Sequence, residues 1–244
     1  MIWLKRARKA LSNLPLVGLV VPKAQRPLGA PSFNSNMYWE TRYAHGGNSG
    51  AGSYGNLAEF KAEVLNAFVK ENKIHSVIEF GCGDGNQLSL AKYHSYVGLD
   101  VSKTAITLCK ERFKHDQTKS FFFYDPEFFV DRAFGLGAEL SLSLDVIYHL
   151  REDKIFESHL RHLFSAAQRF VIIYSTNYNH DALEGALHVK HREFSAWVQQ
   201  NLPGWTMLRR VPNRFRCSSM AEFFIYGKHE SGFPQAWAPN RTLS

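Results

Sequence analysis

Apolar and polar positions follow two different periods along most of the chain, and the change of period predicts its elements. Short apolar or alternating runs predict seven strands, at residues 76–80, 96–99, 121–124, 139–144, 170–174, 205–210 and 222–226. Helical spacing predicts helices at residues 34–43, 56–71, 86–93, 103–114, 152–167 and 191–201. Strands that alternate with helices pair in parallel through right-handed crossovers. The last two strands lack a full helix between them, so we expect a doubly wound α/β sheet of seven strands, mostly parallel, with one antiparallel strand near the C-terminus.

Two further patterns divide the chain into regions. Residues 22–31 contain three prolines and one glycine, as a linker does, and residues 45–55 read HGGNSGAGSYG, which predicts an irregular covering loop. We therefore expect a basic arm and linker at residues 1–33, one domain at 34–230 and a tail at 231–244. A length of 244 residues and an apolar fraction of 45% fit one such domain.

Charge is concentrated at the start of the chain. The formal net charge is +7, and residues 1–26 supply six basic residues and no acidic one. The rest is nearly neutral, which argues against a catalytic face built for nucleic acid. Residues 1–21 also have an apolar helical face. Two alternatives therefore stay open for this segment: weak contact with a membrane surface, or a tail without such a contact. No apolar run reaches the roughly 20 residues of a membrane span. The three cysteines are widely spaced, and we expect a reduced protein in the cytoplasm, with peripheral membrane contact as a variant.

One motif carries most of the chemical information. Residues 79–85 read EFGCGDG, directly after the first predicted strand and before a predicted helix. Glycines permit a sharp turn and close approach of a ligand to the backbone, and a helix start offers free N–H groups. The spacing is G-x-G-x-G, which differs from the G-x-G-x-x-G of dinucleotide-binding proteins. The second predicted strand ends at Asp100, where a carboxylate can accept hydrogen bonds from ribose hydroxyls.

These residues resemble a known family. VIEFGCGDG followed by YVGLDVS is similar to the first two motifs of class I S-adenosylmethionine (SAM)-dependent methyltransferases, and FFFYDP and SLSLDVIYHL agree with later ones. The resemblance covers about residues 38–228 and implies a Rossmann-like fold. It is specific for the cofactor and weakly specific for the acceptor. The opening YWETRY…GGNSGAGSYG…EFKAE also resembles a bacterial subgroup often found near glycan or small-molecule biosynthesis.

The resemblance implies a role for each matching residue. Gly81, Gly83 and Gly85 would line the methionine and ribose end of SAM, and Glu79 would order their loop. Asp100 would hold the ribose, Asp125 would accept from the adenine amine, and Asp145 would lie under the methionine moiety. The loop at residues 49–54, with Ser53 and Tyr54, would close over the cofactor. The product would be S-adenosylhomocysteine (SAH).

Three histidines are candidates for the acceptor side. Transfer of a methyl group to a hydroxyl needs a base, and histidine suits that role at neutral pH. His149 follows the fourth predicted strand, and His188 and His191 follow the fifth. Each has a plain structural alternative, and the pair His188/His191 would also suit an acidic acceptor; as a metal site it lacks further ligands.

The sequence therefore predicts an enzyme that methylates a hydroxyl on a glycan or small molecule. A nucleic-acid or protein methyltransferase is the first alternative, favoured by the basic arm. The fourth strand is followed by DVIY, without an NPPY- or DPPY-like tetrapeptide, which argues against methylation of amino groups on bases. A non-catalytic SAM-binding scaffold is the second alternative. The acceptor and the oligomeric state stay open.

Overall fold

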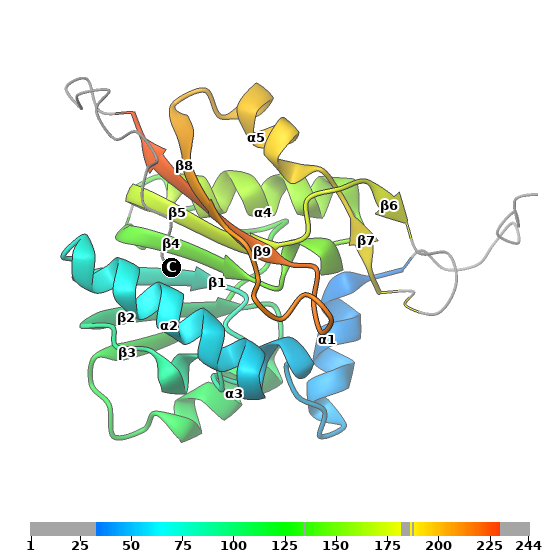
Figure 1. Ribbon diagram of the computed structural model, residues 1–244. Coiled ribbons are helices and arrows are strands. Elements are labelled where there is room, and N and C mark those ends of the chain that lie inside the picture. Colours follow the sequence, from blue (N-terminus) through cyan, green and yellow to red (C-terminus); the bar gives the residue numbers. More distant parts are fainter. Residues whose placement is uncertain (1–32, 134, 182–185, 187, 230–244) are drawn as a thin grey trace, which may run out of the picture. The chain divides into compact units, whose positions relative to one another are not determined.

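A seven-stranded sheet forms the centre of the protein (Figure 1). The computed structural model describes residues 33–133, 135–181, 186 and 188–229. The strand order is β3-β2-β1-β4-β5-β9-β8. The strands are β1 (Ser76–Phe80), β2 (Ser95–Asp100), β3 (Lys119–Phe123), β4 (Ala138–Leu144), β5 (Ala167–Ser175), β8 (Trp205–Val211) and β9 (Glu222–Lys228). Strand β9 is antiparallel to both of its neighbours, and the other pairs are parallel. This confirms the predicted Rossmann-like, mostly parallel sheet with one antiparallel strand.

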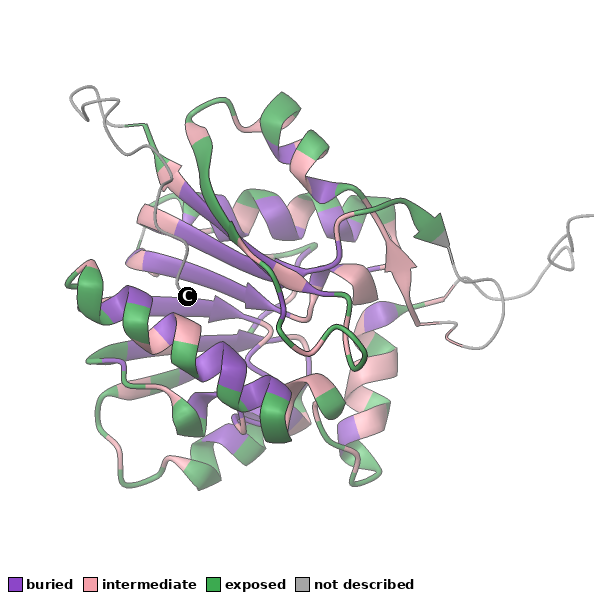
Figure 2. Cartoon of the chain, viewed as in Figure 1, coloured by how far each residue is buried: buried purple, intermediate pink, exposed green. Residues whose placement is uncertain are grey.

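Helices cover both faces of this sheet (Figure 1). The helices are α1 (Ser35–Ala44), α2 (Gly55–Glu71), α3 (Lys103–Arg112), α4 (Asp153–Ser165) and α5 (Phe194–Asn201). Neighbouring residues of a strand point to opposite faces, so Val77 packs with α2 and α3 while Ile78 packs with α4 and α5. The central strands are therefore buried on both sides (Figure 2).

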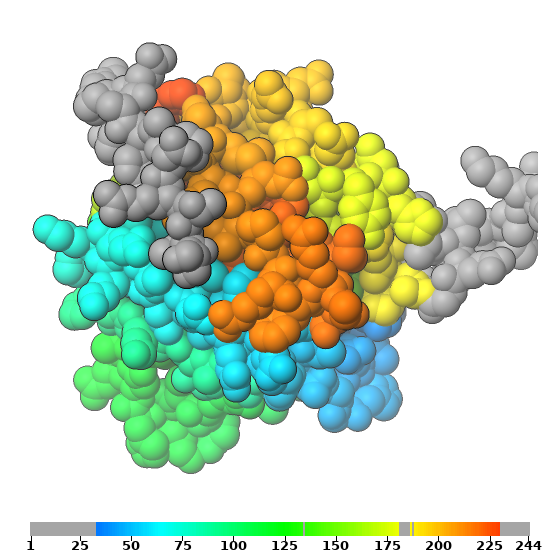
Figure 3. Space-filling model, in the orientation of Figure 1, coloured from blue at the N-terminus to red at the C-terminus, as the bar shows by residue number. Residues whose placement is uncertain are grey.

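The connection between β8 and β9 packs against α2. Phe215 lies edge-on to Phe60 of α2 with 6.3 Å between ring centroids, and the Arg214 guanidinium lies 2.6 Å from the Glu63 carboxylate. Figure 3 shows this segment beside α2 on one face of the molecule. The connection thus extends the layer of α2 over the antiparallel end of the sheet.

The prediction of a helix at residues 86–93 is wrong. Only a 3₁₀ turn at Leu88–Leu90 forms there. The side chain of Asn66 in α2 takes up backbone groups that a helix would use, since its Nδ2 donates to the Leu90 carbonyl and its Oδ1 accepts from the Lys92 N–H. The glycine motif is consequently not followed by an α-helix, and the expected helix N-terminus is missing from this place.

Two predicted helix starts also need correction. Helix α2 begins at Gly55, one residue before the predicted start, and Tyr54 occupies its N-cap without a side-chain cap. Helix α5 begins at Phe194 instead of residue 191, because Lys190–His191 (β7) pairs with His180–Asp181 (β6) in a small separate sheet. Asn34 at the N-cap of α1 and Ser102 at the N-cap of α3 each accept a backbone N–H through their side chains.

The predicted basic arm and the tail at residues 231–244 lie outside the described residues, apart from Phe33. Among residues 33–229 as far as they are described, the longest helices are too short and too polar to cross a bilayer.

Candidate active site

A pocket opens at the carboxyl ends of the parallel strands, beside the point where the strand order reverses between β1 and β4. Loops after β1, β2, β3 and β4 form its floor, and α1 and the loop before α2 cover it. Its lining residues are Trp39, Tyr43, Ser49, Ser53, Lys61, Glu79, Gly81, Cys82, Gly83, Gln87, Asp100, Val101, Tyr124, Pro126, Leu144, Asp145, Val146, His149, Leu150 and His159.

The glycine motif crosses the floor of this pocket. The N–H groups of Gly81 and Cys82 donate to the Leu99 carbonyl at 2.7 and 3.1 Å, which fixes the loop to the end of β2. Gly83 has a φ of +57°, and a Cβ there would lie 2.3 Å from Ser49 Oγ. The turn and the contact with the covering loop both require glycine at this position.

Asp100 ends β2 as a buried carboxylate. One oxygen accepts from the Gly83 N–H at 2.8 Å and the other from the Ser102 N–H at 2.9 Å. Burial raises the pKa of Asp100 to about 6, and these two hydrogen bonds act against that rise. Each carboxylate oxygen has a second lone pair, so the group can still accept hydrogen bonds from a diol in the pocket.

Glu79 lies deeper, at the end of β1. Its Oε2 accepts from the Tyr96 hydroxyl at 2.7 Å. Burial raises its pKa to about 7, and the Tyr96 hydrogen bond and the charge of Lys61 oppose the rise. The residue therefore changes its charge close to neutral pH.

Asp84 fastens the covering loop to the glycine motif. Its Oδ2 accepts from the Ser49 N–H at 3.0 Å and from the Tyr54 hydroxyl at 2.7 Å. Ser49 Oγ in turn accepts from the Asp84 N–H at 3.0 Å and lies 2.9 Å from the Tyr43 hydroxyl. Burial raises the pKa of Asp84, but the N–H groups of Asn86 and Ser49 outweigh it, so the net shift is downward. Asp84 lies within the motif but is not among the site residues predicted from the sequence.

Asp145 follows β4 with a φ of +59°, in the left-handed region that residues other than glycine seldom adopt. Lys61 Nζ donates to one of its carboxylate oxygens at 2.6 Å, and the Tyr148 hydroxyl donates to the other at 2.8 Å. Lys61 is not among the site residues predicted from the sequence. The sequence does contain one sign of its burial: Lys61 is four residues from both Leu57 and Leu65, which places it on the apolar face of a helix.

His149 closes a 3₁₀ turn, Ile147–His149, and is the histidine of the three candidates that lines the pocket. Burial lowers its pKa to about 4, and the nearby His188 contributes to the shift, so the imidazole is neutral at pH 7. Its Nδ1 lies 3.4 Å from the His188 carbonyl. Because a carbonyl only accepts, this contact assigns the proton to Nδ1 and leaves Nε2 as the nitrogen that can take up another.

His188 and His191 lie beside this turn without lining the pocket. The His188 ring stacks between His149, with centroids 5.1 Å apart, and Tyr38 of α1, with centroids 4.8 Å apart. His191 Nδ1 is hydrogen-bonded to Thr176 Oγ1 at 2.6 Å. Because His191 lies in β7, before the start of α5, the two histidines do not share a helical turn.

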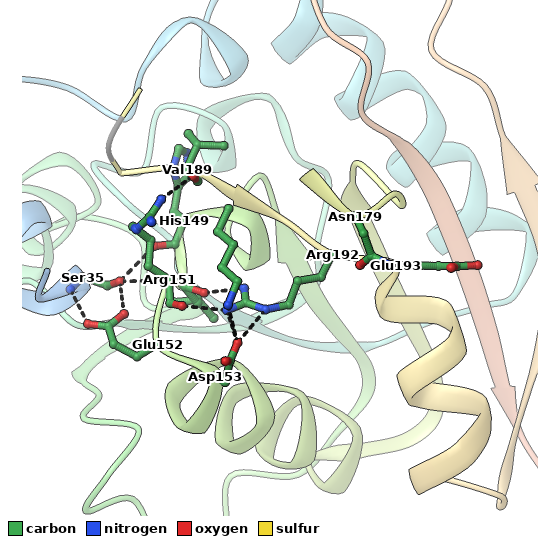
Figure 4. A network of polar contacts seen from close by, with 11 residues as sticks. Ser35, His149, Arg151, Glu152, Asp153, Asn179, Val189, Arg192 and Glu193 are labelled. Carbon is green, nitrogen blue, oxygen red and sulfur yellow. Dashed lines mark hydrogen bonds and ion pairs between the residues drawn. The ribbon is translucent and has the colours of Figure 1, made fainter. Parts of the chain in front are cut away.

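A network of polar contacts holds the His149 segment in place (Figure 4). Arg192 donates to the backbone carbonyl of Arg151 at 2.7 Å and to the Asp153 carboxylate at 2.6 Å. On the other side, the Ser35 N–H donates to Glu152 at 2.8 Å, which joins α1 to the start of α4. These contacts connect α1, the turn after β4 and the segment after β7 around the imidazole.

Three predicted cofactor residues do not line the pocket. Gly85 packs against Phe113, because a Cβ at this position would lie 2.8 Å from the Phe113 ring. Tyr54 lies outside the lining, and its hydroxyl donates to the Asp84 carboxylate. Asp125 lies between Tyr124 and Pro126, which do line the pocket, while its own Oδ1 accepts from the Glu127 N–H at 3.0 Å. The roles of all twelve predicted residues stay predictions at this point.

Across the described residues, no group of three or more His, Cys, Asp or Glu side chains is arranged to hold a metal ion.

Solved methyltransferases have the same architecture. The N-methyltransferase NodS from Bradyrhizobium japonicum WM9, in complex with SAH, matches with a TM-score of 0.61 at 16% identity, over 81% of this chain and 100% of that one. Magnesium protoporphyrin IX methyltransferase (ChlM) from Synechocystis PCC 6803, with bound SAM, matches with a TM-score of 0.58 at 15% identity, over 82% and 100%. The methyltransferase domain of bacterial CtHen1 matches with a TM-score of 0.57 at 22% identity, over 72% and 100%. No protein-family model and no curated protein matches the sequence. The described residues thus have the fold of class I SAM-dependent methyltransferases.

Proposed function

We propose that the protein is a SAM-dependent methyltransferase that methylates a hydroxyl group on a small molecule or glycan. The observation that carries the proposal is one pocket that combines the glycine motif, the carboxylate of Asp100 at the end of β2 and the neutral imidazole of His149. The fold shared with NodS and ChlM agrees with it.

The residues of the pocket fit the cofactor. Asp100 offers lone pairs for the two ribose hydroxyls, and Glu79 and Asp145 offer acceptors for the amino group. Gln87 lines the same pocket, and its Oε1 has no hydrogen-bond partner among the described residues although the side chain is buried. Ser53 and the backbone at Gly81 and Gly83 complete the lining, while Gly85 and Tyr54 would act through the loops they hold. Asp125 would contribute beside Tyr124.

The reaction needs little from the protein beyond alignment and a proton acceptor. Bound SAM would supply a methyl carbon whose bond to sulfur breaks as a bond to the acceptor oxygen forms, leaving SAH. The proton of the acceptor hydroxyl would go to Nε2 of His149, which is unprotonated at neutral pH. Helix α1 would exclude water through Trp39 and Tyr43. His188 would hold the ring of His149 by stacking, and His191 would shape the acceptor side.

A small-molecule or glycan acceptor is favoured by the charge of the domain and the enclosure of His149. Outside the first 26 residues the chain is nearly neutral, whereas a nucleic-acid surface is rich in positive charge. His149 is surrounded by the rings of Trp39, Tyr148 and His188. A nucleic-acid acceptor is the second candidate, because the fold is also that of the small RNA methyltransferase HEN1.

The test is transfer of label from methyl-labelled SAM to fractionated lysate of the host. We expect label in the small-molecule or glycan fraction. Label confined to RNA or protein would contradict the proposed acceptor, and a variant without residues 1–30 would then show whether the basic arm binds that substrate. Binding of SAM without label in any fraction would favour a scaffold. A location in the cytoplasm, and contact of residues 1–21 with a membrane surface, both stay predictions from the sequence.

A further inference from the structure

Lys61 is a fully buried lysine at the pocket. It lies on the face of α2 that packs against the sheet, and its side chain is 0% exposed. Its ammonium has three N–H donors, and among the described residues Asp145 is its one hydrogen-bond partner, at 2.6 Å. The ring of Tyr174 lies on another side, with its centroid 5.4 Å from Nζ.

The charges around the pocket are unequal. Three carboxylates line it, those of Glu79, Asp100 and Asp145, together with the histidines His149 and His159. Burial lowers the pKa of both histidines, to about 4 and about 3, so they are neutral at pH 7. Within the described part of the chain, Lys61 is the one lining residue with a cationic side chain.

The charges of SAM are the reverse of those that line the pocket. It has a sulfonium and an ammonium, which are positive, and a single carboxylate, which is negative. In a site of low dielectric, a ligand carboxylate is stable only beside a cation or several N–H donors. The pocket therefore offers many places for the positive groups of the cofactor and one charged side chain for its negative group.

Building on the proposed function, we propose that Lys61 and Asp145 together bind the amino-acid end of SAM. Lys61 donates to the α-carboxylate and Asp145 accepts from the α-ammonium, so a pair of opposite charges in the protein meets a pair of opposite charges in the ligand. Lys61 is then the residue that selects cofactors with a carboxylate.

The surroundings hold this pair in position. Asp145 is fixed by the Tyr148 hydroxyl and by its own N–H, which donates to the Tyr174 carbonyl at 2.9 Å. The covering loop also packs on this carboxylate, because a Cβ at Gly52 would lie 2.7 Å from Asp145 Oδ2. Lys61 and Asp145 thus come from α2 and from the end of β4, and they contact each other at the lining of the pocket.

The test compares SAH with its decarboxylated analogue, S-adenosyl-3-thiopropylamine, by isothermal titration calorimetry on the full chain. In the wild type we expect SAH to bind about 10- to 100-fold more tightly than the analogue, the range of a charge-assisted hydrogen bond. Lys61→Met should weaken the binding of SAH by the same factor, and its affinity for the analogue should stay within about twofold of the wild-type value. Lys70→Met, which removes an exposed lysine from the same helix, is the matched control and should bind both ligands as the wild type does.

A purely structural role of Lys61 predicts a different result. If Lys61→Met weakens both ligands by the same factor, or if the wild type does not distinguish them, the inference is overturned while the proposed function stands. If the wild type binds neither ligand, the proposed function itself fails. Because a lone buried charge can unfold the protein, the double variant Lys61→Met with Asp145→Asn removes both charges. It should bind SAH and 5′-methylthioadenosine, which lacks the amino-acid end, equally well, and a retained preference for SAH would contradict the inference.

Discussion

At the scale of single residues, burial decides which groups carry charge in the pocket. It raises the pKa of Asp100 to about 6 and lowers that of His149 to about 4. At pH 7 the first is therefore an anion and the second a neutral base, although the ordinary pKa of histidine lies only half a unit below that pH. Both groups are then in the forms that accept a hydrogen bond or a proton.

The role of His149 gives the first prediction. We expect His149→Ala to reduce kcat by about 10²- to 10⁴-fold, the usual contribution of a general base, and to leave the affinity for SAH nearly unchanged. His94→Ala, which removes an exposed imidazole outside the pocket, is the control and should keep the wild-type rate. Single-turnover transfer rates and calorimetry measure the two quantities. A wild-type rate in His149→Ala would remove this residue from the mechanism.

At the scale of elements, the cover over the pocket is fastened at several points. Glu40 of α1 accepts from the hydroxyls of Ser102 and Thr104 at the start of α3, each at 2.7 Å. These hydrogen bonds lower its pKa, so the contact is present at neutral pH. The loop that follows α1 is held by Asp84 and packs on Asp145 through Gly52.

Gly52 therefore offers a test of the covering loop. Its φ is negative, so Gly52→Ala adds no backbone strain, but the new Cβ would lie 2.7 Å from Asp145 Oδ2. We expect the loop to move outward and the binding of SAH to weaken by about 1–3 kcal/mol, the usual cost of overpacking. Gly204→Ala is the matched control, because nothing lies within 4 Å of its added Cβ. Equal calorimetric affinities in the two variants would show that this loop does not form part of the site.

Most elements could be predicted from local periodicity, and the misses have a common cause. The helix expected at residues 86–93 was prevented by Asn66, and the start of α5 was displaced by the pairing of β6 with β7. Both depend on partners nine or more residues away in the sequence, which a local pattern does not contain.

At the scale of the whole molecule, buried titratable groups of opposite effect link stability to pH. His159 is buried, its Nε2 lies 3.0 Å from Ser143 Oγ, and burial lowers its pKa to about 3. The unfolded chain takes up this proton near pH 6.5, so the stabilising contribution is complete above that pH and is lost as the pH falls toward 3. Asp100 and Glu79, with raised pKa values, act in the opposite direction below about pH 6 and 7, where the native state takes up protons first.

A difference measurement isolates one of these groups. We expect the free energy of unfolding of the wild type, relative to His159→Gln, to fall by up to about 1.4 kcal/mol per pH unit between pH 6 and pH 4. Urea unfolding at several pH values measures it, and His94→Gln at the exposed surface is the control. A difference that does not change with pH would mean that His159 is protonated in the native state.

The candidate site was only partly accessible to sequence reasoning. Motif residues such as Gly83 and Asp100 could be placed because they follow predicted strands, whose carboxyl ends meet at one edge of the sheet. The clasp between Asp84 and Ser49 and the pair of Lys61 with Asp145 join positions 35 and 84 residues apart. Such partners follow from the packing of α2 and the covering loop, which the sequence pattern does not specify.

The most direct test of the central claim is calorimetric titration of SAH into the wild type and into Asp100→Asn at pH 7 and pH 5. We predict one site per chain in the wild type, with weaker binding at pH 5, because Asp100 gains a proton as the pH falls through about 6. Asp100→Asn should lose about 1.5–3 kcal/mol of binding free energy at pH 7, the worth of hydrogen bonds to a charged group, and much of the pH dependence with it. Absence of SAH binding to the wild type, or unchanged affinity in Asp100→Asn, would contradict the account.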